Sequence, residues 1–289
     1  MALRPEGHRL LVFGGSGFLG RTIVAWAVAN GISVDATYLT STPPSGGPLG
    51  QEGWHHCDIL DLEGVRALVA EVAPTAVINA AYRQTGDRAV EICSSGAQNV
   101  ATGAAGARAR TVHVSTDLVF DGDLGRAYRE DDPVSPINDY GRAKAAAEEL
   151  VAAANPNSVS VRTSLIYGDP SAPQEQLVQR AVDQDDLSFF TDEWRNPIHV
   201  QHLAAAVGAL ATEVQATGVL HVAGADRVNR LQFAITLAQH LGLDSSTLTG
   251  GPADPSLGPR SSDVALDTTR AQNLGFAIPG PAIALGIQP

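Results

Sequence analysis

The first half of the chain alternates short apolar runs with longer, alanine-rich segments, and no other feature of the sequence restricts the fold as strongly. The apolar runs have the length and composition of buried strands: residues 8–14, 32–39, 54–59, 75–81 and 110–116. Most of the intervening segments have helix-like spacing: residues 21–30, 62–72 and 90–107. Because parallel strands must be joined by such crossovers, the pattern predicts an α/β fold built on a doubly wound parallel sheet.

The second half keeps this alternation at first and then becomes irregular. Further helices are expected at residues 140–154, 200–214 and 231–241, and further strands at 157–168 and 218–224. Beyond the strand that ends at residue 168, the regular alternation of strands and helices is interrupted by prolines and by the run "LSFFTDEWRNP". We therefore expect a nucleotide-binding domain over residues 1–165 and a smaller, mainly substrate-binding lobe over 166–289, with 200–222 returning to the first sheet.

A glycine-rich turn follows the first of these strands. The run "VFGGSGFLG" places Gly14, Gly17 and Gly20 between an apolar strand and a helix. In such a turn the first glycine permits a tight bend, the second lets backbone N–H groups approach a pyrophosphate, and the third lets helix and strand pack closely. A close-packed turn without a ligand also uses glycines, but the βα units behind this one favour a dinucleotide-binding Rossmann fold.

The end of the second strand favours NADP(H) over NAD(H). NAD-specific sites place an acid there to bind the ribose 2′-hydroxyl, whereas this strand ends in "TYLTST". Asp35 lies inside the strand and is interpreted as a partly exposed strand residue, while Thr40 and Ser41 are able to donate to a 2′-phosphate. Asp58, after the third strand, is placed to accept a hydrogen bond from adenine, or alternatively to cap the helix from residue 61 onward.

Three side chains form a candidate catalytic set. The run "YGRAK" puts Tyr140 and Lys144 four residues apart, on one face of a helix. Tyrosine has a pKa of about 10, and a neighbouring ammonium that favours the phenolate lowers that pKa. Thr116 ends the fifth strand, in "STDLVFDG", and doubly wound sheets bind ligands beyond the carboxyl ends of their strands. YxxxK alone is a frequent chance match, so its position after this strand is what favours catalysis.

Six runs occur in the order found in one enzyme family: "GGSGFLG", "INAAY", "STDLVFDG", "YGRAK", "RTSLIYG" and "RSSDVALD". Together they resemble the extended short-chain dehydrogenase/reductases, and among these the dTDP-4-dehydrorhamnose reductase branch, with its runs STDYVFDG, YGxxK, RTSWVYG and RPxxSxLD. The resemblance implies that Thr116 polarises a substrate carbonyl and that Tyr140 is the general acid. It also implies that Lys144 tunes Tyr140 and binds the nicotinamide ribose.

The same resemblance implies a cofactor site and a substrate site. The implied cofactor contacts lie at the pyrophosphate, at the adenine and along the cleft: Gly14, Gly17, Phe18 and Leu19; Asp58 and Ile59; Ala80, Ala81 and Tyr82. The candidates for the substrate side are Asp117, Leu165, Trp194, Arg195 and Arg260. The two arginines are included because a nucleotide diphosphate needs cations. Asp117 either orients the sugar or caps its turn.

The chain also departs from the family's patterns. Leu118 stands where the related 4,6-dehydratases carry the glutamate of Thr-Asp-Glu, so an acid needed for water elimination is missing. Leu165 replaces the tryptophan of RTSWVYG, Cys93 stands where many members have asparagine, and Phe18 where the branch often has glutamine. The run after Arg260 lacks the proline and the serine of RPxxSxLD. Leu118 thus favours a reductase over a dehydratase, whereas the other four differences bear on the substrate and not on the chemistry.

Composition narrows the remaining possibilities. A chain of 289 residues, 44% of them hydrophobic, can build a sizeable core. A net charge of −12, with only 19 lysines and arginines, argues against nucleic-acid binding. Cys57 and Cys93 are too few for a disulfide framework, and no N-terminal apolar run is long enough for a signal or a membrane span, so we expect a soluble, cytoplasmic protein. "HHCD" at 55–58 carries metal-type side chains, but strand alternation divides them between two faces, and no metal site is expected.

These observations predict an oxidoreductase of deoxysugar biosynthesis, an NAD(P)H-dependent reductase of a 4-keto-6-deoxy sugar nucleotide that acts as a monomer or homodimer. Two alternatives remain. A sugar-nucleotide epimerase uses the same three side chains with tightly held NAD. A non-catalytic regulatory subunit, such as the β subunit of methionine adenosyltransferase, can keep the same motifs.

Overall fold

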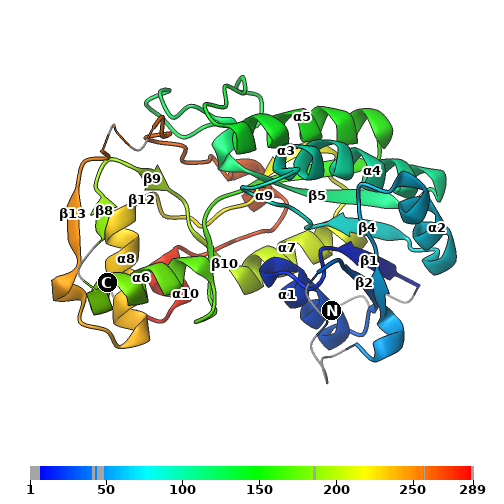
Figure 1. Ribbon diagram of the computed structural model, residues 1–289, viewed down its shortest axis with the longest axis horizontal. Coiled ribbons are helices and arrows are strands. Elements are labelled where there is room, and N and C mark those ends of the chain that lie inside the picture. The colour runs from blue at the N-terminus through cyan, green and yellow to red at the C-terminus, as the bar shows by residue number, and fades with distance from the viewer. Residues whose placement is uncertain are drawn as a thin grey trace. The chain divides into compact units, whose positions relative to one another are not determined.

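A computed structural model describes residues 7–40, 43, 49–184, 187–254, 256 and 258–287 (Figure 1). The chain divides into two compact units that interleave along the sequence. The first unit comprises Met1–Ser115, Arg142–Val161 and Ala204–Leu220, and the second comprises Thr116–Gly141, Arg162–Leu203 and His221–Pro289. A domain boundary at residue 165 stays a prediction, because these units follow packing and not a single cut in the chain.

The first unit is built on a seven-stranded sheet. Its strands are, in spatial order, β11 (Gly218–His221), β6 (Ser158–Thr163), β5 (Arg110–Thr116), β4 (Ala76–Asn79), β1 (Arg9–Phe13), β2 (Ser33–Tyr38) and β3 (Trp54–His56). The pairs β1–β2, β2–β3, β1–β4 and β4–β5 run parallel. The order reverses direction between β1 and β4, which confirms the predicted doubly wound Rossmann sheet.

Helices cover both faces of this sheet (Figure 1). The helices α2 (Leu62–Val72), α4 (Ala97–Gly106) and α5 (Asp139–Ala154) lie on one face, and α1 (Phe18–Ala29) and α7 (Val200–Thr212) lie on the other. Gly208 of α7 lies so close to the indole of Trp26 that a β-carbon would collide with it. Small residues therefore let α1 and α7 pack closely together.

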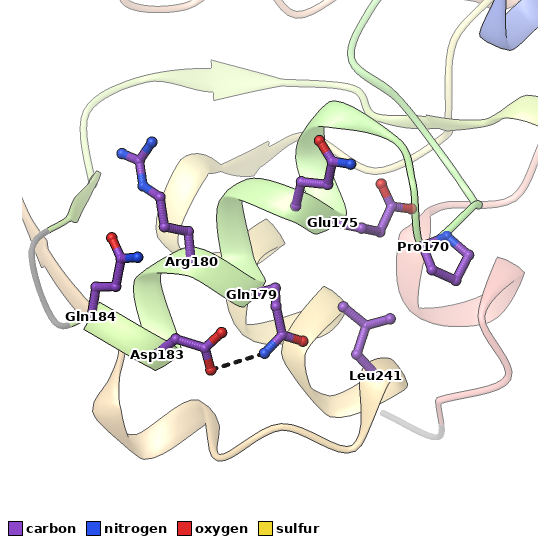
Figure 2. Close-up of a pocket in the computed structure, with 8 residues that line it drawn as sticks. Pro170, Glu175, Gln179, Arg180, Asp183, Gln184 and Leu241 are labelled. Atoms are coloured by element: carbon purple, nitrogen blue, oxygen red, sulfur yellow. Dashed lines mark hydrogen bonds between the residues drawn. The ribbon is translucent and has the colours of Figure 1, made fainter.

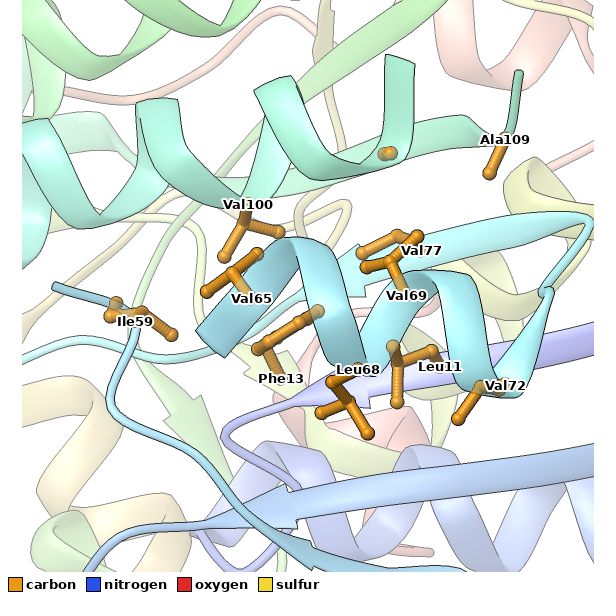
Figure 3. Packing of buried hydrophobic residues seen from close by; sticks show 11 residues of the cluster. Leu11, Phe13, Ile59, Val65, Leu68, Val69, Val72, Val77, Val100 and Ala109 are labelled. Atoms are coloured by element: carbon orange, nitrogen blue, oxygen red, sulfur yellow. The ribbon is translucent and has the colours of Figure 1, made fainter. Parts of the chain in front are cut away.

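The core beneath α2 and α4 explains why the first strands and helices form where the pattern predicts them (Figure 3). Alternation along β1 turns Leu11 and Phe13 toward this face. Val65, Leu68, Val69 and Val72 of α2 follow helical spacing, so they all meet the same cluster. Burying each such side chain contributes about 1.5–3 kcal/mol relative to leaving it in water.

The helix expected at residues 90–107 is continuous in direction but not in hydrogen bonding. A short α3 (Ala89–Glu91) runs into a π-helical turn, Ile92–Gly96, before α4 begins. This turn contains the buried Cys93. Helical periodicity in a sequence does not distinguish a π turn from an α turn, and π turns inside helices are frequent at functional sites.

The described part of the second unit combines short strand pairs with two longer helices and two short ones. The pairs are β7 (Ile166–Tyr167) with β10 (Ile198–His199), β9 (Trp194–Arg195) with β12 (Val228–Asn229), and β8 (Ser188–Phe190) with β13 (Thr249–Gly251). The main helices are α6 (Pro173–Gln184) and α8 (Arg230–Leu241), and the short ones are α9 (Thr269–Asn273) and α10 (Pro281–Ala284). The strand expected at 157–168 is thus divided between β6 and β7. A capping box formed by Asn229 and Gln232 fixes the start of α8.

A hollow of about 310 Å³ lies on the second unit, lined by α6 and by Leu241 of α8 (Figure 2). Most of the residues that line it have polar side chains, and among these Gln179 donates a 3.0 Å hydrogen bond to Asp183. None of the substrate-side residues expected from the sequence lines it. Among the described residues, no helix has both the length and the apolar character that a membrane span requires.

Candidate functional site

The glycine turn between β1 and α1 has the geometry of an anion cradle. Gly14 has a φ of +77°, and a β-carbon there would lie 2.6 Å from the backbone nitrogen of Ala81. A β-carbon on Gly20 would collide with the carbonyl oxygen of Gly14. Gly17 is the N-cap of the 12-residue helix α1, and no side chain caps that end. The backbone N–H groups in the first turn of α1 and the helix dipole therefore favour a bound pyrophosphate.

The end of β2 lacks a free acid, but for a different reason from the one expected. Asp35 is not partly exposed: it is only 7% exposed and accepts a 3.0 Å hydrogen bond from Nε of Arg9. His55 Nε2 lies 2.9 Å from its other oxygen. Asp35 is thus held by strand neighbours. Thr40 follows the strand in an exposed position, and Ser41 lies outside the described residues.

Asp58 and Ile59 follow β3 and take different positions. Asp61, and not Asp58, caps α2 by accepting a hydrogen bond from the backbone of Gly64. The capping alternative for Asp58 is therefore wrong; its Oδ1 accepts from the backbone of Leu60 in a local turn instead. The side chain of Ile59 packs in the core beneath α2 and α4. Contact of Asp58 and Ile59 with adenine stays a prediction.

The segment after β4 lies against the glycine turn. Ala81 donates a 3.2 Å hydrogen bond to the side chain of Asn79, and its backbone is the closest neighbour of Gly14. Ala80 donates to the carbonyl of Phe13. Tyr82 is exposed. The structure thus brings Gly14 and the predicted cleft residues Ala80 and Ala81 together at the carboxyl ends of β1 and β4.

Thr116 is the last residue of β5 and the N-cap of a 3₁₀ turn, Asp117–Val119. Its hydroxyl oxygen accepts a 3.2 Å hydrogen bond from the backbone of Leu118. The hydroxyl donates to Asp117 Oδ1 over 3.3 Å, at the long end of the normal range. Because that bond is weak, redirecting the hydroxyl proton toward a bound carbonyl oxygen would cost little.

Tyr140 and Lys144 lie one turn apart in α5, as their spacing predicts. Tyr140 is partly exposed in the first turn. Lys144 is 2% exposed, and burial lowers its pKa from 10.5 to about 8. Its ammonium donates to the carbonyl of Val114 on β5. The catalytic roles of Thr116, Tyr140 and Lys144 stay predictions.

Asp117 does not cap its turn, and its contact with the sugar stays a prediction. It is 4% exposed, and Ser164 donates a 2.6 Å hydrogen bond to its Oδ2. Burial raises the pKa of Asp117, against the opposing effects of Arg195, whose Nε lies 3.9 Å away, and of Ser164. Thr116 takes the capping position that one alternative assigned to Asp117.

The two candidate arginines differ in their surroundings within the second unit. Arg195 is buried, and its guanidinium donates to the carbonyls of Trp194 and Ser261 at 2.8 and 3.0 Å. Arg260 is more exposed, pairs with the buried carboxylate of Glu193 and lies over the ring of Phe190. Both already have partners, so a phosphate would add to an existing charge network.

Glu193 and Arg230 complete this network, and neither was expected from the sequence. The Nη1 atom of Arg230 is buried and has no hydrogen-bond partner. Burial, followed by the charge of Arg195, lowers its pKa to about 10. We define the arginine cluster as Arg195, Arg230 and Arg260 with the carboxylates Asp117 and Glu193. Its formal charge is one positive, since three arginines face two carboxylates.

The remaining substrate-side candidates lie in the same unit with apolar or stacking neighbours. Leu165 packs against the core cluster of α6 and α8. The ring of Trp194 is covered by the guanidinium of Arg227 at 3.9 Å, and Arg227 is in turn bound to Asp263. Across the residues that the structure describes, no group of three histidines, cysteines or acidic residues is arranged to hold a metal ion.

Comparison with known proteins adds a decisive observation to this geometry. The family model described as the RmlD substrate binding domain matches residues 8–281. The chain belongs to this family. The resemblance to the dTDP-4-dehydrorhamnose reductase branch is thereby confirmed.

Two relatives by sequence and one solved structure agree with this assignment. The chain is 31% identical over 281 residues to a dTDP-4-dehydrorhamnose reductase of Mycolicibacterium smegmatis, which covers 93% of this chain and 81% of that protein. It is 26% identical over 287 residues to methionine adenosyltransferase 2 subunit beta of Rattus norvegicus, covering 93% and 83%. The fold matches a dTDP-4-dehydrorhamnose reductase from Bacillus anthracis in complex with NADP, with a TM-score of 0.81 and 22% identity over 99% of this chain and 97% of the other.

Proposed function

We propose that this RmlD-family chain is an NAD(P)H-dependent oxidoreductase that reduces the ketone of a 4-keto-6-deoxy sugar nucleotide. The observation that carries the proposal is the match to a named dTDP-4-dehydrorhamnose reductase along 93% of the chain. The family model matches residues 8–281, a range that contains the predicted set Thr116, Tyr140 and Lys144. Leu118 supports reduction over dehydration, since no acid follows Asp117.

A nicotinamide dinucleotide fits the first unit, because the Gly14 turn leaves no room for a β-carbon and α1 begins there uncapped. When bound, this group supplies the hydride. Its adenine ribose would meet the end of β2, where Asp35 is already paired with Arg9 and Thr40 is exposed. These features support NADP(H) over NAD(H) as the preferred cofactor.

The residues of the chain polarise the ketone, supply the proton and stabilise the resulting phenolate. Thr116 donates a hydrogen bond to the ketone oxygen, and Tyr140 gives its proton to that oxygen as carbon is reduced. The ammonium form of Lys144 stabilises the phenolate that Tyr140 leaves behind. Proton transfer of this kind contributes about 10²- to 10⁴-fold to a rate.

The arginine cluster supports a nucleoside diphosphate as the anionic part of the substrate. Its one excess positive charge and the unpaired Nη1 of Arg230 give a phosphate both a charge partner and a hydrogen-bond donor. The protein acts as a monomer or homodimer in this proposal.

The test is ketone-dependent oxidation of NADPH by the Tyr140→Phe variant. Turnover should be lost while NADPH binding, measured by fluorescence, is retained. Tyr128→Phe is the matched control, because the Tyr128 hydroxyl donates to Asp121 in a loop and has no part in the proposed reaction. Unchanged turnover in Tyr140→Phe would refute the proposed role, and NAD that stays bound through purification would favour an epimerase.

A second function is supported by the match to methionine adenosyltransferase 2 subunit beta over 93% of the chain. In that case the protein would regulate another enzyme and bind the dinucleotide without turnover. Failure to oxidise NADPH with any keto sugar, together with specific co-purification of a second enzyme, would favour this function.

A further inference from the structure

Lys144 is the only lysine in the chain, and it is buried beside a histidine that the proposed reaction does not use. His113 of β5 is completely buried, and its Nε2 lies 3.5 Å from Nζ of Lys144. On its other side, Nδ1 of His113 lies 3.3 Å from Nδ2 of Asn79. His113 and Asn79 are register partners on the adjacent strands β5 and β4, so the sheet itself holds the two side chains together.

The backbone of Ala81 determines which ring nitrogen of His113 carries the proton. Its N–H donates to the side-chain oxygen of Asn79 over 3.2 Å. Only the oxygen of an amide side chain can accept, so the NH₂ group of Asn79 must face His113. Nδ1 of His113 is then the acceptor of that NH₂, and a neutral imidazole with Nδ1 as acceptor carries its proton on Nε2.

We propose that His113, held in its Nε2–H tautomer by Asn79, is a positioning residue that presents an N–H group to Nζ of Lys144 and so favours the neutral amine. An ammonium has no lone pair to accept from that N–H, whereas a neutral amine has one. The inference rests on the proposed function only for the task that it gives Lys144.

The other groups around Lys144 act in the opposite direction. Cys93, from the π-helical turn, and Glu148, from α5, both raise the pKa of Lys144. Glu148 also accepts a 2.6 Å hydrogen bond from Ser115 of β5. Burial outweighs these groups and brings the pKa to about 8. Burial lowers the pKa of His113 most, and the charge of Lys144 lowers it further, so the ring stays neutral.

We call the chain of contacts from Ala81 through Asn79 and His113 to Lys144 the relay. It also connects Lys144 to the glycine turn. Ala81, whose N–H sets the orientation of Asn79, is the residue whose backbone contacts Gly14. A shift of the turn that moved Ala81 would release the Asn79 amide and, through His113, change the environment of Lys144.

The test uses the intact protein with lysine labelled by ¹³C at the ε carbon, which gives one signal because there is one lysine. Its wild-type titration midpoint is expected at about 8. In His113→Gln an amide oxygen can face Nζ and accept from the ammonium. The midpoint of the Lys144 titration should therefore rise by about 1 pH unit. In Asn79→Asp the carboxylate accepts from both Ala81 and His113, which moves the ring proton to Nδ1 and should also raise the midpoint.

Controls separate this relay from general effects. His55→Gln makes the same change on β3, which β4, β1 and β2 separate from β5, and it should leave the midpoint unchanged. Asn79→Asp should add little in a His113→Gln background if it acts through the ring. Midpoints in His113→Gln and Asn79→Asp equal to that of the folded wild type would overturn the proposal.

A second measurement is made on the wild-type protein, and it uses a variant only to assign the signal. Wild-type protein labelled with ¹⁵N-histidine should show a ring with a protonated Nε2 and an unprotonated Nδ1, assigned to His113 by its loss in His113→Gln. An Nδ1–H tautomer would overturn the proposal. Neither measurement uses a substrate, so a protein without reductase activity would still show these results.

Discussion

Ser164 donates a 2.6 Å hydrogen bond to Oδ2 of Asp117, across 47 residues of sequence. The bond joins the turn after β5 to the segment between β6 and β7, both within the second unit. It holds the carboxylate where it faces Arg195 and receives the hydroxyl of Thr116. Asp117 therefore connects the predicted carbonyl-polarising residue to the arginine cluster.

Replacing Asp117 with asparagine should destabilise the protein by about 3 kcal/mol, because a buried carboxylate that balances Arg195 and Arg230 is lost. Ser164→Ala removes only a hydrogen bond and should cost about 1 kcal/mol. Urea unfolding of both variants measures the difference. Equal losses of stability in the two variants would show that the charge of Asp117 does not balance the cluster.

Removing Arg230 should have opposite effects on stability and on ligand binding. Arg230→Met takes away a buried cation with an unpaired Nη1, so the free energy of unfolding should rise by about 1 kcal/mol. The affinity for a nucleoside diphosphate should fall by about tenfold or more. Arg66→Met, at an exposed ion pair with Glu63, should change neither quantity. Calorimetry with a nucleoside diphosphate and thermal unfolding check the two effects, and tighter binding by Arg230→Met would contradict the assignment.

Local patterns in the sequence predicted the sheet, the glycine turn and the pairing of Tyr140 with Lys144. Strand and helix periodicities and the spacing of glycines are properties of short windows, so they can be read without tertiary information. The capping of α2 was ambiguous for the same reason, because Asp58 and Asp61 both precede it and only the backbone geometry selects Asp61.

The partners of buried polar groups could not be predicted in this way. Asp35 was expected to be partly exposed, but Arg9 and His55 reach it from β1 and β3, which flank β2. His113 lies on β5, and its partner Asn79 is set by strand register with β4, 34 residues away. Glu193 and Arg230 carried no motif at all. Contacts of this kind depend on the closed fold.

Gly20 should not tolerate alanine although it lies in a helix, where alanine is intrinsically favoured. A β-carbon there would collide with the carbonyl of Gly14, and the backbone on both sides is fixed by the turn. Gly20→Ala should therefore lower the free energy of unfolding by about 1–3 kcal/mol and weaken dinucleotide binding. Gly106→Ala, in α4 with open space around it, should be neutral or stabilise by about 0.5–1 kcal/mol. Thermal unfolding with and without NADPH measures both, and equal behaviour of the two variants would contradict the close approach.

Asp121 should make stability depend on pH in the acid range. Its carboxylate accepts 2.6 Å hydrogen bonds from Ser135 and Tyr128 and a 3.0 Å bond from the backbone of Asp123, and these bonds lower its pKa from 3.8 to about 2. Because the folded pKa lies below the unfolded one, the stabilisation is present above pH 4 and is lost as pH falls toward 2. After allowing for solvent screening of a partly buried group, Asp121→Asn should cost about 1 kcal/mol at pH 6.

The difference in unfolding free energy between wild type and Asp121→Asn should therefore shrink between pH 4 and pH 2, as measured by urea unfolding at a series of pH values. Asp123→Asn removes the exposed neighbouring carboxylate in the same loop and is the matched control. Tyr128 and Ser135 donate to different oxygens of Asp121, and an asparagine amide offers only one acceptor oxygen in place of these two. A difference for Asp121→Asn that stays constant down to pH 2 would mean that these hydrogen bonds do not lower the pKa of Asp121.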